Sequence, residues 1–157
     1  MKLKVYLETS IISYLAARPS RDIIVSAHKK ITVEWWHKKR NHFDLYTSKL
    51  VIQEASAGNT EAAAKRIVFL AGLPRLTINE NVMALASCLL AAKAVPQQAM
   101  DDVYHIAMAA VHGMDFLLTW NCKHIANATM RHRIEQACRT HGFEPPIMTT
   151  PEQLLEE

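Results

Sequence analysis

Four oxygen-bearing side chains stand out in this sequence, because their types and places could support metal chemistry. Glu8 and Asn121 follow short apolar runs that read as strands, whereas Glu54 and Asp102 lie in helix-like segments. Several carboxylates gathered without a balancing Lys or Arg would repel one another, and a divalent cation would stabilise them. Oxygen ligands without thiolate or paired-His spacing favour Mg²⁺ or Mn²⁺ over zinc. Such a cation activates water and neutralises phosphate, as phosphodiester hydrolysis requires.

Each of these residues also has an ordinary structural interpretation. A carboxylate or amide is favoured near a helix N-terminus, which would account for Glu8, for Asp101 as an N-cap and for Asp102 in a first turn. Glu54 shares a helix face with Leu50 and should point toward the sheet, unless it lies at the exposed end of a short helix. An inward carboxylate is costly unless it is paired or bound to a cation.

Strand-like and helix-like segments alternate along the chain, and these elements must position the four residues. The expected strands cover 3–7, 44–48, 75–78, 116–120 and 146–149. The expected helices cover about 10–17, 20–42, 49–58, 60–71, 80–93, 101–112 and 123–141, with a short one after Pro151. We expect Ser48 and Gly58 to cap the 49–58 helix and Asn121 to be the N-cap of the 123–141 helix.

The alternation predicts one α/β domain over residues 1–157, with a parallel sheet covered by helices on both faces. Sites in such sheets form beyond the carboxyl ends of the strands, which is where Glu8 and Asn121 stand. The chain is 50% hydrophobic and 21% charged, with a net charge of +3, so it permits nucleic-acid binding without requiring it.

Cysteine usage and hydropathy indicate a cytoplasmic protein. Cys88, Cys122 and Cys138 are odd in number and lack CxxC spacing, which argues against a disulfide framework and fits a reducing compartment. The sequence starts without a signal-peptide pattern, and its apolar runs are shorter than the roughly 20 residues of a membrane span. Trp35 and Trp36 are expected in the core, with a partner groove as the alternative.

Three segments in order carry a resemblance to a known family. They are "VYLETSIISYL" (5–15), "VIQEAS" (51–56) and "DDVYHIAMAAVHGMDFLLTWNCKHIAN" (101–127). Together they resemble the PIN-domain family, in particular its bacterial and archaeal branch of VapC-type toxins. The third segment is the most specific, because an acid is followed three residues later by His-Ile-Ala and then by the strand end "LLTWN". The resemblance implies a three-layer α/β/α fold around a parallel sheet of four to five strands.

The resemblance also implies site residues, because many family members are Mg²⁺- or Mn²⁺-dependent ribonucleases. The metal ligands it implies are Glu8, Glu54 and Asp102, with Asp101 as the neighbouring candidate for the last. Asn121 completes the catalytic set by holding the place of a fourth acid. The residues expected to contact the substrate or ligand waters are Thr9, Ser10, His105 and Lys123. His105 could instead orient a carboxylate or simply pack, and Lys123 and His124 could simply be surface residues at a helix start.

The resulting expectation is a metal-dependent endoribonuclease, with RNA as substrate and, from the resemblance, a small antitoxin and a homodimer as partners. Two departures from the family pattern, Glu8 in place of Asp and Asn121 in place of an acid, favour an alternative. That alternative is a catalytically weak or inactive PIN-like module that binds RNA or a protein. A phosphatase-like doubly wound enzyme would want a nucleophilic Asp after the first strand, and the sequence has no Gly-rich phosphate loop either.

Overall fold

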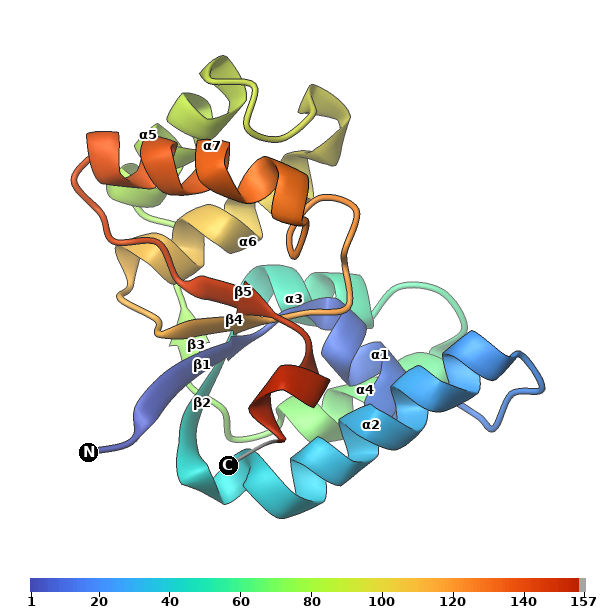
Figure 1. The fold of residues 1–157 in the computed structure, drawn as a ribbon. Coiled ribbons are helices and arrows are strands. Elements are labelled where there is room, and N and C mark those ends of the chain that lie inside the picture. The colour runs from blue at the N-terminus through green and yellow to red at the C-terminus, as the bar shows by residue number, and fades with distance from the viewer. Residues whose placement is uncertain (156–157) are drawn as a thin grey trace.

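A parallel β-sheet runs through the centre of the protein, in a computed structural model that describes residues 1–155 (Figure 1). In that part of the chain the sheet has five strands in the order β3-β2-β1-β4-β5, and every neighbouring pair is parallel. The strands are β1 (Leu3–Leu7), β2 (Phe43–Ser48), β3 (Arg75–Leu76), β4 (Phe116–Leu118) and β5 (Ile147–Thr149). The predicted parallel sheet of four to five strands is confirmed.

Two groups of helices cover the sheet. The α-helices are α1 (Thr9–Ala16), α2 (Ile23–Lys39), α3 (Lys49–Ala55), α4 (Thr60–Leu70), α5 (Glu80–Ala91), α6 (Met100–Val111) and α7 (Ala128–Thr140). Three 3₁₀ turns within residues 1–155 are η1 (Arg40–His42), η2 (Gln97–Ala99) and η3 (Pro151–Leu154). Helices α5, α6 and α7 gather on one side of the sheet, and α1, α2 and α4 gather on the other (Figure 1). This is the three-layer α/β/α arrangement that the resemblance implies.

The central strand β1 determines where polar side chains meet. Its residues 5–7 are fully buried, as expected for a parallel strand covered on both faces. Because β1 pairs in parallel with both β2 and β4, the carboxyl ends of all three strands lie at one edge of the sheet. Glu8 follows β1 at this edge, Ser48 ends β2, and Thr119 follows β4.

The short helix α3 begins as predicted but ends earlier. The Ser48 side chain accepts a hydrogen bond from the backbone N–H of Val51 at 3.1 Å, so its prediction as N-cap is confirmed. The predicted C-cap is wrong, because α3 ends at Ala55 and Ser56 is the C-cap residue. Gly58 instead lies in the following turn, with φ at +82°, a conformation that glycine adopts without strain.

The segment after β4 differs most from the prediction. The helix expected over 123–141 begins only at Ala128, with Asn127 as its N-cap. The Asn121 side chain caps a turn instead, since its Oδ1 accepts from the backbone N–H of His124 at 3.0 Å. An asparagine side-chain oxygen closes a local turn as readily as it caps a helix, and here Asn121 does the first and Asn127 the second.

The core contains two of the three tryptophans. Trp35 and Trp36 on α2 are both buried, so their assignment to the core is confirmed. Cys138 on α7 is also buried, and Cys88 on α5 is half-buried. Within residues 1–155, the helices are all too short or too polar to cross a membrane.

Candidate metal centre

Two carboxylates from different elements lie together at the carboxyl edge of the sheet. Glu8 is the N-cap residue of α1, and Glu54 lies near the end of α3. With His105 of α6 they form a group whose potential ligand atoms all lie within 4.8 Å of one another. Glu8 is buried, His105 is fully buried, and the Glu54 side chain is 28% exposed, so the group opens to solvent on the Glu54 side.

One oxygen of Glu8 is held by hydroxyl groups. Its Oε1 accepts from the Thr119 hydroxyl at 2.6 Å, from the Ser10 hydroxyl and from the Ser10 backbone N–H at 3.2 Å. The two hydroxyls accept in turn from the backbone N–H groups of Trp120 and Asn121, at 2.8 and 2.9 Å. These N–H groups can only donate, so each hydroxyl proton is free to point at Glu8. Within residues 1–155 no hydrogen bond reaches its Oε2 atom.

Glu54 is held in a comparable way. Its Oε1 accepts from the Thr9 hydroxyl at 2.5 Å and from Nε2 of His105 at 2.8 Å. The other ring nitrogen of His105 lies 2.7 Å from the Tyr6 hydroxyl, which lies 2.7 Å from the Ser48 hydroxyl. Hydrogen bonds therefore extend from the start of α3 through the core to the Glu54 carboxylate.

Burial and neighbouring charges shift the pKa values of this group. Burial alone would raise the pKa of Glu54, but the hydrogen bond and charge of His105 and a neighbouring hydroxyl lower it. Burial alone would lower the pKa of His105, but the hydrogen bond that it donates to Glu54 and the charges of Glu8, Glu54 and Asp102 raise it. Both directions favour a carboxylate beside an imidazolium. Burial raises the pKa of Tyr6, which keeps its hydroxyl protonated.

Asp102 borders this group without belonging to it. It lies with Asp101 in the first turn of α6, whose N-cap is Ala99, so the prediction of Asp101 as N-cap is wrong. The Oδ2 atom of Asp102 lies 3.0 Å from Nδ1 of His124, and both side chains are partly exposed. Asp102 is one helical turn before His105, and its charge contributes to the raised pKa of that histidine. The structure thus brings His105, rather than Asp102, to within 4.8 Å of both glutamates.

The other predicted site residues lie beside the two carboxylates, in the core, or at or near the surface. Thr9 and Ser10 are bound to the two carboxylates, as described above. His105 is fully buried, which fits the orienting role and provides no exposed atom for contact with RNA. Asn121 is half-buried at the rim, and Lys123 is exposed in the turn that follows it.

Sequence reasoning missed Thr119, Tyr6 and Ser48 as parts of the site. Thr119 follows β4 directly, as Glu8 follows β1, but the strand expected over 116–120 enclosed it, so the rule that points to strand ends did not identify it. Tyr6 lies inside β1, where a tyrosine is ordinarily read as a packing residue, and Ser48 was assigned only to the helix cap.

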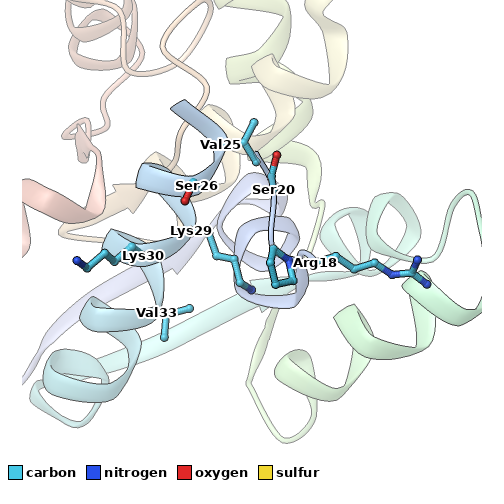
Figure 2. A pocket seen from close by; sticks show the side chains of 8 residues that line it. Arg18, Ser20, Val25, Ser26, Lys29, Lys30 and Val33 are labelled. Carbon is cyan, nitrogen blue, oxygen red and sulfur yellow. The ribbon is translucent and has the colours of Figure 1, made fainter. Parts of the chain in front are cut away.

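The cavity in Figure 2 is separate from this group. It lies between the loop after α1 and one face of α2, with a volume of about 300 Å³. It is lined by Arg18, Pro19, Ser20, Val25, Ser26, Lys29, Lys30 and Val33. The Lys29 ammonium donates to the carbonyl of Ala17 at 2.5 Å and more weakly to those of Tyr14 and Leu15, and the Arg18 side chain extends away from the other residues (Figure 2). These lysine contacts stabilise the end of α1.

Comparison with known proteins shows a likeness of fold. No protein-family model matches the sequence, and no curated protein matches it. A chain in the crystal structure of VapBC2 from Rickettsia felis, bound to a DNA fragment from their promoter, matches with a TM-score of 0.59 and 16% identity, over 94% of this chain and 98% of that one. A chain of VapBC-1 from nontypeable Haemophilus influenzae matches with a TM-score of 0.59 and 18% identity, over 96% of this chain and 99% of that one.

These matches define the class of the fold. The chain has a PIN-like α/β fold similar to that of the matched VapBC2 and VapBC-1 chains, and the similarity spans nearly the whole chain. The resemblance read from the three sequence segments is thereby confirmed for the fold. At 16–18% identity the roles of individual residues follow from the geometry of this chain alone.

Proposed function

We propose that the protein is a Mg²⁺- or Mn²⁺-dependent endoribonuclease that hydrolyses RNA phosphodiester bonds, acting as the toxin of a toxin–antitoxin pair. The observation that carries the proposal is the group formed by Glu8, Glu54 and His105 at the carboxyl edge of a PIN-like sheet. The similarity to chains of VapBC complexes supports a small antitoxin as partner.

The donor set fits a hard divalent cation. The Oε2 atoms of Glu8 and Glu54 and the Oδ1 atom of Asp102 receive no hydrogen bond from residues 1–155, so three carboxylate oxygens are available. The only ion pairs that these acids form within the described chain are with histidines, so no Lys or Arg there pairs with them. Mg²⁺ and Mn²⁺ prefer such oxygen ligands. Glu8 and Glu54 would hold the cation, and Asp102 would complete the site from α6.

The chemistry that the cation supplies is neutralisation of the scissile phosphate and activation of a water molecule. The chain's own residues prepare the site for it. The hydroxyls of Ser10 and Thr119 fix Glu8, and Thr9 and His105 fix Glu54, so the carboxylates are oriented before RNA binds. With the cation bound, a carboxylate of this site would accept the proton of the attacking water.

Two residues near this site would meet the substrate. The exposed Lys123 ammonium would contact an RNA phosphate, and Asn121 beside it would hold a water molecule through its amide. Asn121 carries no charge, so it adds orientation to the site without adding electrostatic attraction for a second cation.

RNA cleavage by the purified protein tests the proposal. Single-stranded and structured RNA should be cleaved with Mg²⁺ or Mn²⁺ and remain intact with chelator. Glu54→Gln and Asp102→Asn should each lower the rate by at least about 100-fold, whereas Glu61→Gln, the same change at an exposed glutamate of α4, should leave it unchanged. Cleavage that persists in chelator or in both site variants would exclude the mechanism.

One observation favours a second candidate, a PIN-like module that binds RNA without cutting it. Asp102 is engaged by His124 and lies outside the 4.8 Å group, so the cation could be held by Glu8 and Glu54 alone. Metal-independent RNA binding without cleavage under any of these conditions would select this candidate.

A further inference from the structure

A chain of polar side chains runs through the protein core behind Glu54. Tyr6 on β1, Ser48 at the end of β2 and His105 on α6 are all fully buried. Burying a hydroxyl or imidazole is costly unless each polar atom is hydrogen-bonded, and an apolar core of the same shape avoids that cost. Ser48 also serves as the N-cap of α3, but stability of the sheet gives no reason for polar residues at Tyr6 and His105.

The hydrogen bonds along this chain have a defined direction at both ends. The Val51 backbone N–H donates to Oγ of Ser48 at 3.1 Å, so Ser48 accepts there and its own proton is available to Tyr6, 2.7 Å away. At the other end the Glu54 carboxylate only accepts, so Nε2 of His105, 2.8 Å away, carries a proton. The Tyr6 hydroxyl between them, 2.7 Å from Nδ1 of His105, can donate or accept. The chain of contacts therefore stays intact whichever partner supplies that proton.

These hydrogen bonds fix the orientation of the His105 ring. An imidazole ring bound at only one nitrogen can still turn about its side-chain torsions, whereas a ring bound at both nitrogens by groups on different elements has one orientation. Tyr6 on the central strand provides the second attachment of His105, and the two rings are also in tilted contact at 5.8 Å. The ring then presents Nε2–H to Glu54 in one fixed direction.

We propose that Tyr6 is a positioning residue for the metal centre, acting through His105 on the Glu54 carboxylate, with Ser48 anchoring the Tyr6 hydroxyl. This inference rests on the proposed function, since it concerns how that site is held in shape. Residues that orient metal ligands in this way typically change metal affinity by about 10–100-fold when they are removed.

Mn²⁺ binding to the full chain without RNA provides the test, with the dissociation constant measured by electron paramagnetic resonance. Tyr6→Phe should weaken Mn²⁺ binding by about tenfold or more. The matched control is Tyr46→Phe, the same change at the residue paired with Tyr6 on β2, whose hydroxyl makes no side-chain hydrogen bond within residues 1–155. This control should leave the dissociation constant unchanged.

A double-variant cycle separates positioning from general damage to the core. In His105→Gln the side-chain amide nitrogen occupies the place of Nε2 and nothing replaces Nδ1, so Tyr6 loses its route to Glu54. Tyr6→Phe should therefore weaken Mn²⁺ binding in the native chain and have no further effect in the His105→Gln background. Equal losses in both backgrounds would overturn the inference, because they would show that Tyr6 acts through packing.

The remaining outcomes are also decisive. Tyr6→Phe that folds and binds Mn²⁺ like the native chain overturns the inference and leaves the proposed function standing, whereas a native chain that binds no Mn²⁺ overturns both. If Tyr6→Phe does not fold, Ser48→Ala takes its place in the same cycle. Its effect on α3 through the lost N-cap should appear equally in both backgrounds, so only the part lost in His105→Gln reports on Tyr6.

Discussion

Glu8→Asp should weaken the metal centre, although aspartate is the residue that the PIN-domain pattern has at this place. The Glu8 oxygen Oε1 accepts from the Thr119 hydroxyl at 2.6 Å and from the Ser10 hydroxyl. Removing one methylene withdraws the carboxylate by about 1.5 Å, so the distance to Thr119 grows to roughly 4 Å, beyond hydrogen-bond range. The bond from the Ser10 backbone N–H should survive, because aspartate is a good N-cap residue.

The size of the effect follows from the bond that is lost. A hydrogen bond to a charged group contributes about 1.5–3 kcal/mol, so the free energy of unfolding should fall by about 2 kcal/mol. For a domain of this length that lowers the melting temperature by roughly 4–8 °C. Because the carboxylate is then free to turn, Mn²⁺ affinity should fall by about tenfold. Urea denaturation in chelator measures the first quantity, and Mn²⁺ titration measures the second.

Thr119→Val supplies the control, since it removes the same hydrogen bond from the other side. It should destabilise the native chain by more than Glu8→Asp does, because it also removes the hydrogen bond from the Asn121 backbone N–H at 2.9 Å. Only the part of its cost that comes from Glu8 should disappear in the Glu8→Asp background. A Glu8→Asp protein with unchanged stability and tighter Mn²⁺ binding would refute this reasoning, because it would show that the hydroxyls do not determine the position of the carboxylate.

Three further predictions follow from other contacts. The pKa of His105 is raised, so its charged ring stabilises the fold fully below the ordinary pKa of 6.5, and this stabilisation is lost as pH rises through the folded value. The pKa of Glu54 is lowered, so its carboxylate stabilises the fold above the ordinary pKa of 4.5, and this stabilisation is lost as pH falls through the folded value. Urea denaturation across pH should give maximal stability from this pair between those values, and His105→Gln should flatten both limbs. Lys29→Met removes the ammonium at the end of α1 and should lower the urea midpoint by the equivalent of about 1–2 kcal/mol. Arg66→Met frees the carbonyls of Ala55 and Ala57, to which the guanidinium donates at 2.8 and 2.7 Å, and should lower the midpoint by a similar amount, with an unchanged midpoint arguing against either contact.

The sequence predicted the elements whose patterns are strong and local. The buried run of β1 and the alternation of strands with crossover helices led directly to a parallel sheet covered by helices on both faces, which the structure has. The predicted start of α7 was wrong because Asn121 and Asn127 have the same capping chemistry, and only the tertiary contacts decide which of them begins the helix. The sequence shows which Ser, Thr, Asn and Asp side chains could cap a helix or a turn, but it does not show which backbone N–H group each of them binds.

The candidate site likewise contains residues that the sequence predicted and residues that it missed. The strand-end rule led to Glu8, and an inward-facing acid on a short helix led to Glu54, and the structure places these two together. Tyr6 and Thr119 were missed because a buried tyrosine in a strand and a threonine next to one are among the commonest packing residues of sheets. Each is joined to the group by a hydrogen-bond partner 99 or 111 residues away in the chain, which no local pattern contains.

The choice of neutral hydroxyls to hold Glu8 has a physical consequence for the proposed chemistry. A lysine or arginine at the place of Thr119 would fix the carboxylate equally well, but its charge would cancel the attraction for a cation. Hydroxyl groups donate hydrogen bonds without adding charge, so they orient the acid and do not oppose the binding of a cation. Glu54 differs, because one of its donors is a histidine with a raised pKa, and its attraction for a cation depends on the charge of that ring. Of the two glutamates, Glu8 is therefore the one whose hydrogen-bond donors bring no charge of their own to the proposed metal centre.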